Sequence, residues 1–390
     1  MVARVRRRRR GRPRRPSGHH CRRVLRRGGA ACSWRRRPVV TALLQRIERF
    51  IVAGGGAFDG EFVELAAAAA RFGYERVEPY RRLCDRRGVD IASLDDWRLA
   101  PAVPTSAFKS LRLAAATPRE VFRSSGTTRG AERRSVHYHP YPDLYRTVID
   151  ASFAGACLPA DAERLPILSL IPDRAIAPDS SLSFMAAHVF ERHAAPGSAW
   201  AVRETGLDLD LAGRWLRARA EGEPVLVLAT ALALVLLLDR LEGEAGGAIR
   251  LPPGSRAFET GGFKGRSLET TPEAVRRRAR ILLGLDPDAV VREYGMTELT
   301  SQAYSRPGGE RLRTPPWMPF RVLDPETLEE VEDGQTGLLA FFDLANIGSV
   351  CHVLTEDLGI REDSAFRLVG RASGAELRGC SLTTEELGAA

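Results

Sequence analysis

The feature that most limits the fold of this chain is an alternation of short apolar runs with longer helical patterns. Between residues 165 and 294, apolar runs such as LPILSLIP, PVLVLA and AVVREY are separated by segments with helical periodicity, such as SLSFMAAHVFERH and TALALVLLLDRLEG. Strands that alternate with helices favour an α/β fold with a largely parallel sheet. Residues 40–100 also read as helical, whereas short β runs follow residue 318. The sequence therefore predicts a large α/β domain with helices on both sides of its sheets and a small β subdomain late in the chain.

The positive charge of the chain is concentrated at its N-terminus. Residues 1–37 hold 16 arginines and no acidic residue or lysine, so the net charge of +9 becomes −7 for residues 38–390. Three interpretations of this Arg-rich leader stay open: a nucleic-acid-binding arm, a targeting peptide, or an upstream start codon in a GC-rich gene, with translation beginning near Val39 or Val40. All three predict a disordered segment. The acidic remainder argues against a specific nucleic-acid partner for the globular part.

Cysteine spacing and hydropathy bear on the location of the protein. The six cysteines show no CxxC spacing, which argues against a zinc site and is typical of a reducing cytoplasm. The longest apolar run, residues 225–238, has 14 residues and is too short to span a bilayer. A buried strand followed by a helix explains it better. We therefore expect a cytoplasmic protein without a membrane span.

A loop rich in small and hydroxyl residues, SSGTTRG, occupies residues 124–130. Backbone N–H groups and hydroxyls in such a loop can surround phosphate oxygens. It is not a Walker A loop, because no Gly-Lys-Ser/Thr follows. The alternative is a polar surface turn. Apolar and alternating residues on either side, 121–122 and 135–138, predict a hairpin around the loop.

A second motif, REYGMTE, covers residues 292–298 at the end of a predicted strand. Folds of the α/β class place ligand sites at the carboxyl ends of their strands. The Thr297 hydroxyl beside the Glu298 carboxylate can hold a Mg²⁺ ion that bridges phosphates. The Tyr294 ring can pack against a base or an acyl group. The alternative is an ordinary helix start.

A third motif, TEDLG at residues 355–359, precedes a Gly-Arg pair at residues 370–371. The carboxylate of Asp357 can accept both hydroxyls of a ribose, and Arg371 can reach the same ribose or a phosphate. An acidic turn is the alternative interpretation.

The order and rough spacing of these motifs resemble the acyl-adenylate-forming superfamily, which holds acyl-CoA ligases, luciferases and peptide-synthetase adenylation domains. The resemblance covers roughly residues 100–380. It implies ATP and Mg²⁺ as cofactors, a carboxylic acid as substrate, and catalytic roles for Thr128 and Glu298, with Glu298 as the metal ligand. The nucleotide contacts that it implies are Ser124, Ser125, Gly126, Thr127, Thr128, Tyr294, Gly295, Thr297, Asp357 and Arg371.

Three further segments, PTSAFK (104–109), ETGGFKGR (259–266) and AELRGCSL (375–382), resemble the acyl-protein synthetase family of the bacterial luminescence fatty-acid reductases. The two lysines of the chain, Lys109 and Lys264, lie in these segments. The resemblance implies that Gly261 and Gly262 contact the nucleotide. Lys264 would neutralise phosphate charge in catalysis, with a solvated surface lysine as the alternative. Substrate-binding residues that we expect in the acyl pocket are Phe263 and His188, with a core histidine as the alternative for His188.

The C-terminal part departs from most of the superfamily. Relatives continue into a cap domain with a lysine that contacts the acid, whereas this chain stops 19 residues after Arg371 and has no lysine beyond Lys264. The acyl-protein synthetase family is similarly short and holds the acyl group on a cysteine near its C-terminus, a position that Cys380 matches. A thiolate attacks an acyl-adenylate readily, and nearby Arg371 and Arg378 could lower its pKa. The alternative is a small buried residue, and Cys351 is a rival nucleophile in an apolar setting.

The expected function is ATP-dependent activation of a carboxylic acid, a fatty acid by resemblance, to an acyl-adenylate. The acyl group would pass to Cys380 and then to a partner, a reductase or a carrier protein. Residues 38–370 would form the adenylate-forming domain, with the cap truncated, and residues 371–390 a short tail. Two alternatives stay open: a ligase that delivers to CoA or a carrier thiol directly, and a non-catalytic nucleotide-binding subunit. His137 and His139 could bind a metal, but no third ligand suggests itself.

Overall fold

The computed structural model describes residues 36–55, 60–125, 134–160, 162–244, 246–261, 271–306, 309–372, 383 and 386–387. The chain divides into two units, Met1–Val40 and Thr41–Ala390. The second unit contains every described strand. Residues 1–35 of the Arg-rich leader lie outside the described residues.

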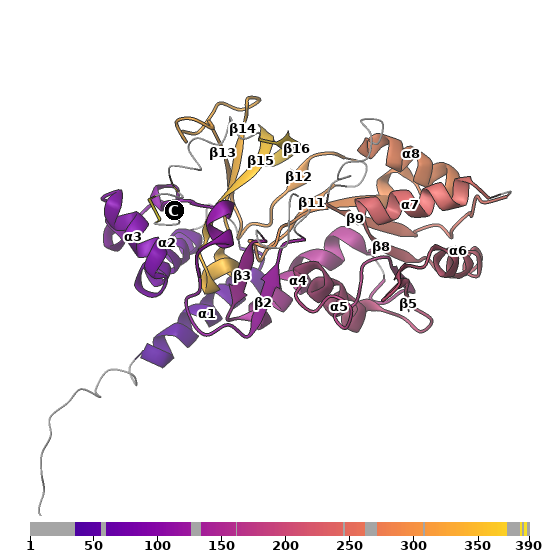
Figure 1. The fold of residues 1–390 in the computed structure, drawn as a ribbon, viewed down its shortest axis with the longest axis horizontal. Helices are drawn as coiled ribbons and strands as arrows, with labels where there is room; N and C mark the ends of the chain where they lie inside the picture. The colour runs from indigo at the N-terminus through magenta and orange to yellow at the C-terminus, as the bar shows by residue number, and fades with distance from the viewer. Residues whose placement is uncertain are drawn as a thin grey trace, which may run out of the picture. The chain divides into compact units, whose positions relative to one another are not determined.

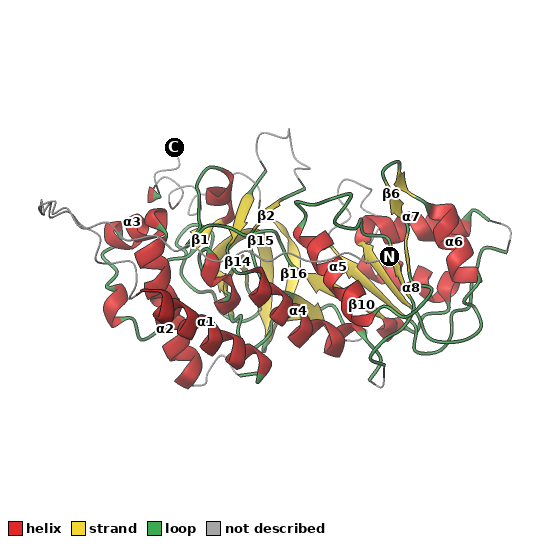
Figure 2. Ribbon diagram, turned by 90° about the horizontal axis from the view of Figure 1, so that it is seen from below, coloured by secondary structure: helices red, strands yellow, loops and turns green. Residues whose placement is uncertain are grey.

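The N-terminal third of the second unit is helical, as the sequence predicts. Helix α2 has an alanine-rich face that buries Phe62, Leu65 and Phe72, and it packs against α3 (Figure 2). Pro79 stands in the first turn of α3, where its missing N–H costs no hydrogen bond. The helices and short helical turns of this region are α1 (Arg36–Val52), α2 (Gly60–Arg76), α3 (Glu78–Arg86), η1 (Ile91–Ser93), η2 (Trp97–Leu99) and η3 (Thr105–Lys109).

Helix α3 also holds the last described residues of the chain. The guanidinium of Arg87, the residue after α3, lies 2.8 Å from a carboxylate oxygen of Glu386 and donates to the Thr383 hydroxyl at 2.7 Å. Arg82 donates to the backbone oxygen of Leu387 at 3.0 Å, and the Leu387 side chain is fully buried. We call these contacts between α3 and residues 383–387 the arginine clasp.

One half of the main sheet is parallel and carries helices on both faces, as the alternating sequence pattern predicts (Figure 1). Alternate residues of each strand face opposite helix layers: Leu226 and Leu228 pack with α4 and α5, whereas Val227 packs with α6, α7 and α8. The strands, in spatial order, are β10 (Val290–Tyr294), β9 (Arg256–Thr260), β8 (Leu226–Thr230), β4 (Ile167–Ser169) and β5 (Ala199–Trp200). The helices are α4 (Pro142–Cys157), α5 (Ser181–His193), α6 (Leu209–Arg217), α7 (Ala231–Glu242) and α8 (Pro272–Leu283).

The starts of these helices follow local sequence signals. The hydroxyls of Ser180, Thr230 and Thr271 accept hydrogen bonds from backbone N–H groups three residues on, at 3.1 to 3.2 Å. Such caps satisfy N–H groups that the helix leaves without partners. Local hydroxyl side chains therefore mark where α5, α7 and α8 begin.

The other half of the sheet is mainly antiparallel and includes the predicted β region after residue 318. It continues the parallel half through the β10–β11 pair, so the two halves form one 12-stranded sheet. Rings of Phe320, Phe341 and Phe366 pack together beneath it, with centroids 5.2 to 6.4 Å apart. Its strands are β11 (Ala303–Ser305), β12 (Leu312–Arg313), β13 (Phe320–Leu323), β14 (Thr336–Phe342), β15 (His352–Glu362) and β16 (Ala365–Arg371), with β1 (Val103–Pro104) parallel to β15.

Two small sheets and two short helical turns complete the described fold. The pair β2 (Glu120–Arg123) and β3 (Val136–His139) is antiparallel, which confirms the predicted hairpin. The second small sheet pairs β6 (Val202–Arg203) with β7 (Gly206–Leu207), and the turns are η5 (Pro287–Ala289) and η6 (Leu344–Gly348). Among the described helices, none has the length and apolarity needed to cross a membrane.

Candidate active site

Three residues predicted to bind nucleotide are joined by hydrogen bonds where β10 ends. The Tyr294 hydroxyl donates to Oδ2 of Asp357 at 2.8 Å, and Nε of Arg371 donates to Oδ1 of Asp357 at 2.9 Å. Asp357 and Arg371 are direct cross-strand partners on β15 and β16. Each carboxylate oxygen has a second lone pair, so Asp357 can still accept hydrogen bonds from a ligand. These three residues are called the Tyr-Asp-Arg set below.

Thr355 fixes the backbone of Asp357. Its hydroxyl donates to the Leu339 carbonyl oxygen on β14 at 2.8 Å and accepts from the Asp357 N–H at 3.1 Å. The ladder between β14 and β15 shifts register between Leu338 and Ala340, beside this point. Irregular pairing of this kind re-aims side chains at functional sites. The threonine of the TEDLG motif therefore positions the aspartate.

The segment after β10, residues 295–302, is held from below by a buried aspartate. Asp343 accepts hydrogen bonds from the N–H groups of Thr300 and Ser301 at 2.9 and 2.8 Å, and from the Ser301 hydroxyl at 2.7 Å. Asn346 donates to the Glu298 carbonyl oxygen at 2.9 Å. A buried carboxylate that accepts several N–H bonds fixes the local backbone strongly. Glu298 therefore stands on a rigid support.

The Glu298 side chain is buried, with 7% of the residue exposed. Burial raises the pKa of its carboxyl, against the opposing effects of a hydrogen bond from the Ser135 hydroxyl and the positive charges of Arg371 and Lys109. A divalent cation would offset the cost of keeping this carboxylate ionised in a buried place. Mg²⁺ typically binds one or two carboxylates and completes its shell with phosphates and water. Glu298 thus fits a Mg²⁺ ion that is held mainly by nucleotide phosphates.

The β2–β3 hairpin links the described base of the predicted phosphate loop to Glu298. The Ser124 hydroxyl accepts from the Ser135 N–H at 3.0 Å, and the Ser124 N–H donates to the Ser135 carbonyl oxygen at 3.0 Å. Ser135 is the residue whose hydroxyl bonds to Glu298. The hairpin base is therefore linked to the second motif. Gly126, Thr127 and Thr128 lie outside the described residues.

Two histidines of β3 support the same segment. Nδ1 of His137 donates to the Thr297 carbonyl oxygen at 2.7 Å, and Nε2 of His139 lies 3.1 Å from the Thr300 hydroxyl. Burial lowers the pKa of His137 to about 4 and that of His139 well below its usual value. Both rings are therefore neutral, and they support the segment through these contacts. Within the part of the chain that is described, no group of three His, Cys, Asp or Glu side chains could hold a metal.

A buried carboxyl lies behind the Tyr-Asp-Arg set, on the opposite face of β10. Thr260 donates to Oε2 of Glu293, and burial raises the pKa of Glu293 to about 7. Gly295 is needed beside it, because a Cβ atom there would lie 2.2 Å from Oε1 of Glu293. No sequence pattern predicted this role for Glu293, which reads as an ordinary polar residue at a strand end.

Gly261 lies at the same edge of the sheet. Thr260 ends β9 and pairs with Glu293, which is one residue before the end of β10. Gly261 and Tyr294 are the residues that directly follow the two members of this pair. Its φ of 79° lies in the left-handed region, which favours glycine. The other residues predicted from this segment, Gly262, Phe263 and Lys264, lie outside the described residues, as does Cys380.

His188, predicted to line the acyl pocket, faces α4 instead of the Tyr-Asp-Arg set. Its Nε2 lies 2.8 Å from Oδ1 of Asp150, and 8% of the residue is exposed. Nδ1 of the ring is buried with no hydrogen-bond partner. Its predicted substrate contact stays a prediction.

Lys109 belongs to the site, although the motifs gave it no role. Its Nζ lies 3.6 Å from Oε1 of Glu356, the neighbour of Asp357, and its charge acts on Glu298. The one sequence signal was its rarity, since the chain has only two lysines. Asp343 and Asn346 were also missed, as was the contact of His137 with Thr297, because contacts between distant segments leave no local pattern.

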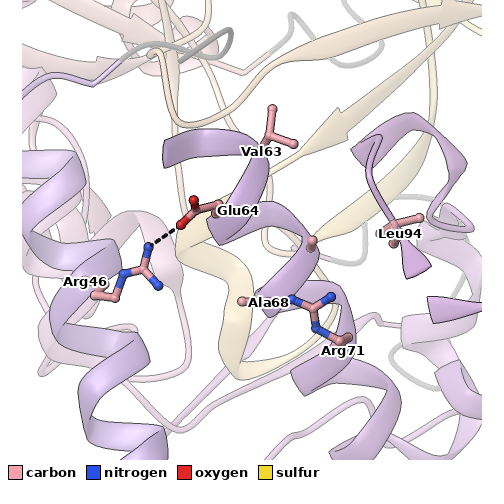
Figure 3. A pocket seen from close by; sticks show the side chains of 7 residues that line it. Arg46, Val63, Glu64, Ala68, Arg71 and Leu94 are labelled. Carbon is pink, nitrogen blue, oxygen red and sulfur yellow. Dashed lines mark hydrogen bonds and ion pairs between the residues drawn. The ribbon is translucent and has the colours of Figure 1, made fainter. Parts of the chain in front are cut away.

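A separate cavity of about 400 Å³ lies between α1, α2 and the segment around Leu94 (Figure 3). Its polar groups are already engaged: Arg46 pairs with Glu64 at 3.1 Å, and Arg71 donates to the Ala92 carbonyl oxygen at 3.3 Å. None of the predicted site residues lines it.

The chain is similar in sequence to a known family and to curated proteins. Residues 62–387 match the family described as "Acyl-protein synthetase, LuxE". The chain is 23% identical over 336 residues to the "Long-chain-fatty-acid--luciferin-component ligase" of Vibrio harveyi, covering 83% of this chain and 86% of that protein. It is 24% identical over 347 residues to the protein of the same name from Aliivibrio fischeri, covering 82% and 86%.

Solved structures show the same fold. Two crystal structures of 2-hydroxyisobutyryl-CoA ligase match with a TM-score of 0.58. The structure in complex with 2-HIB-AMP is 15% identical and covers 85% of this chain and 67% of that chain. The structure with 2-HIB-AMP and CoA is 16% identical and covers 87% of this chain and 70% of that chain. At this identity the likeness concerns the fold alone. The family match covers most of the sequence, and the chain therefore belongs to the acyl-protein synthetase family, as an enzyme with the α/β fold of adenylate-forming ligases.

Proposed function

We propose that this enzyme activates a carboxylic acid with Mg-ATP, forms an acyl-adenylate, and transfers the acyl group to a thiol. The observation that carries the proposal is the convergence of three distant motifs. Ser124 is hydrogen-bonded to Ser135, and Ser135 to Glu298. The positive charge of Arg371, which donates a hydrogen bond to Asp357, acts on the Glu298 carboxylate. A phosphate loop, a metal-binding carboxylate and a ribose-binding aspartate are the parts that adenylation needs.

In the first step, a carboxylate oxygen of the acid attacks the α-phosphorus of ATP. The bond between that phosphorus and the oxygen leading to the β-phosphate breaks, and pyrophosphate leaves with the electron pair. Asp357 would accept hydrogen bonds from the ribose hydroxyls, and the Tyr294 ring would pack against the base or the acyl group. Hydroxyls and N–H groups of the loop at 124–130 would stabilise the phosphate charge. Mg²⁺, held by Glu298 and Thr297, would neutralise part of the same charge when bound.

In the second step, a thiolate attacks the acyl carbonyl carbon and AMP leaves, which produces a thioester. We assign this role to Cys380, on the family resemblance. The described thiols are unsuited to it, because burial raises the pKa of Cys84 to about 12 and those of Cys157 and Cys351 well above the usual range. A buried thiol with a raised pKa is a poor nucleophile. The rival role of Cys351 therefore loses support.

The names of the relatives suggest the substrate and the acceptor. Both curated relatives are called long-chain-fatty-acid ligases that act on a luciferin component. We propose a long-chain fatty acid as the substrate and a protein, either a reductase or a carrier protein, as the final acyl acceptor. We also propose that residues 38–370 form the adenylate-forming domain, that residues 371–390 form a tail, and that the enzyme works in the cytoplasm.

Acid-dependent exchange of labelled pyrophosphate into ATP tests the first step. We expect exchange with one or more fatty acids in a panel of chain lengths, aryl acids and β-keto acids, and none without acid. Asp357→Asn should weaken exchange, since it removes the charge that orients Arg371. If no acid supports exchange, adenylation is wrong and the non-catalytic subunit is the better interpretation.

A labelled acid tests the second step. The protein should acquire a label that hydroxylamine removes, because thioesters react with hydroxylamine. Cys380→Ser should abolish this label while pyrophosphate exchange continues. A hydroxylamine-labile label that survives Cys380→Ser would remove Cys380 from the mechanism, and direct ligation to CoA or a carrier thiol would then be favoured.

A further inference from the structure

Lys109 is a cation of the candidate active site, and the surrounding structure holds its backbone in place. It ends η3, in which Thr105, Ala107 and Phe108 are buried. Just before η3, β1 pairs with β15 through Val103 and Val353. A lysine whose backbone is anchored in this way can reach only a small region, unlike a lysine on an open surface loop.

The packing of Phe108 ties Lys109 to the support of the second motif. The Phe108 ring meets the His137 ring edge-on, with centroids 5.9 Å apart. His137 in turn bonds to the carbonyl oxygen of Thr297, next to Glu298. Lys109 and Glu298 are therefore held by one continuous set of contacts.

The region around Lys109 is rich in carboxylates. Its Nζ lies 3.6 Å from Oε1 of Glu356, and its charge acts on the carboxyl of Glu298. The Glu356 contact is longer than the 2.7–3.2 Å of a good N–H···O bond. The 40% exposure of the Lys109 side chain also leaves its three donors within reach of a ligand.

Arg371, the other cation that acts on Glu298, has a different task. Its Nε donates to Asp357 at 2.9 Å, so its guanidinium is oriented by the predicted ribose site. If a ribose binds at Asp357 and Mg²⁺ binds at Glu298, the triphosphate has to pass between these two carboxylates. Lys109 is near both, since its Nζ lies 3.6 Å from Glu356, the neighbour of Asp357, and its charge acts on Glu298.

We propose that Lys109 contacts the phosphates of ATP and stabilises the charge on the departing pyrophosphate. This inference rests on the proposed adenylation. The oxygen that leaves the α-phosphorus gains negative charge as its bond breaks, and a fixed ammonium beside it lowers the barrier. The role needs no proton transfer by Lys109. A lysine serves this purpose as a point charge.

Four variants separate this role from a merely structural one. Lys109→Met removes the charge, and Lys109→Arg keeps it. Glu356→Gln removes the ion-pair partner. Arg112→Met is a matched control, because Arg112 is an exposed cation three residues away whose guanidinium packs over the Tyr138 ring.

The measurement is acid-dependent pyrophosphate exchange, with kcat and the KM for ATP determined separately and the melting temperature recorded for each variant. We expect Lys109→Met to lower kcat about 10²-fold, the usual effect of removing one stabilising group from a transition state. Lys109→Arg should restore a large part of the loss. Glu356→Gln and Arg112→Met should stay within about threefold of the unchanged enzyme, since exposed ion pairs contribute little.

The outcomes distinguish this inference from the proposed function. An active unchanged enzyme whose Lys109→Met variant has an unaltered kcat would overturn the role of Lys109 and leave adenylation standing. A loss in Glu356→Gln equal to that in Lys109→Met would also overturn it, because the ion pair would then be what matters. Absence of exchange in the unchanged enzyme would instead contradict the proposed function itself. If Lys109→Met melts early, Lys109→Arg decides: a kcat of Lys109→Arg as low as that of Lys109→Met, in a variant that melts normally, would overturn the role of the charge.

Discussion

At the scale of single residues, Asp357 is the centre of the proposed nucleotide site. Its two oxygens accept from Tyr294 and Arg371, and its N–H donates to Thr355. The Tyr294 hydroxyl is the one buried donor among the side-chain partners, whereas Arg371 reaches solvent with 69% of its side chain exposed. Tyr294 should therefore fix the orientation of the carboxylate more firmly than Arg371.

Tyr294→Phe tests this division. The change keeps the ring and removes a hydrogen bond to a charged group, which is worth about 1.5–3 kcal/mol. We expect kcat/KM for ATP in pyrophosphate exchange to fall about 10- to 100-fold. Tyr138→Phe is the control, since the Tyr138 ring packs under Arg112 away from Asp357. Equal activity of the two variants would show that Tyr294 acts only through its ring.

Sequence patterns predicted several residues of this site, but not the residues that hold them in place. The order of motifs predicted Tyr294, Asp357 and Arg371 as nucleotide contacts, and these three are hydrogen-bonded to one another. Lys109 and Asp343 were not predicted, because their partners are distant in sequence and a lone Lys or Asp carries no periodic signal. His188 shows the opposite case: its helix was predicted correctly, but which neighbour the ring meets depends on how α4 and α5 pack.

At the scale of secondary-structure elements, α3 does two things. One face is buried through Tyr80 and Leu83. Arginines at its C-terminal end form the arginine clasp on residues 383–387, in which the Leu387 N–H also donates to the Thr383 carbonyl oxygen at 3.1 Å. The clasp is made mostly of exposed ion pairs and hydrogen bonds, which contribute little to global stability. Its effect should therefore be local.

Arg87→Met should release residues 383–387 without unfolding the protein. We expect faster hydrogen exchange at the Leu387 amide, since local opening no longer costs the contacts to Glu386 and Thr383. The melting temperature should change by less than that of a core substitution. Arg81→Met, an exposed position on the same helix, provides the comparison. Unchanged exchange at Leu387 in Arg87→Met would show that the buried Leu387 side chain holds this segment alone.

The elements themselves were largely predictable, because each has a local cause. Helical periodicity predicted α5 and α7, and the alternating pattern predicted the parallel half of the sheet. The continuity of that half with the antiparallel strands was not predicted. It depends on the pairing of β10 with β11. The residue pattern of one strand does not predict which strand of another region pairs with it.

At the scale of the whole molecule, Glu293 links stability to pH. Burial raises its pKa from 4.5 to about 7, so the folded protein holds this proton more tightly than the unfolded chain. The resulting stability is fully present below pH 4.5 and is lost as the pH rises through 7. A shift of this size corresponds to about 3 kcal/mol. The buried histidines act in the opposite direction, because the lowered pKa of His137 removes stability as the pH falls toward 4.

Glu293→Gln should remove this dependence, because an amide can accept from Thr260 without titrating. We expect the difference in unfolding free energy between Glu293→Gln and the unchanged enzyme to shift in favour of the variant by up to about 3 kcal/mol between pH 5 and pH 8. Denaturant titrations at several pH values measure it. A difference that stays constant across this range would mean that Glu293 does not titrate there.

The alternation along β10 also has a consequence for how a gene encoding this enzyme can change. Glu293 and Tyr294 are adjacent residues on opposite faces of one strand, and a slip of one position exchanges the two faces. A single-codon deletion within β10 would turn a carboxylate toward Asp357 and bring the phenol against the helices, so that two acids face each other where a nucleotide should bind. Substitutions in β10 keep the register of the strand, whereas deletions do not. We therefore expect insertions and deletions to accumulate in the connections before and after this strand.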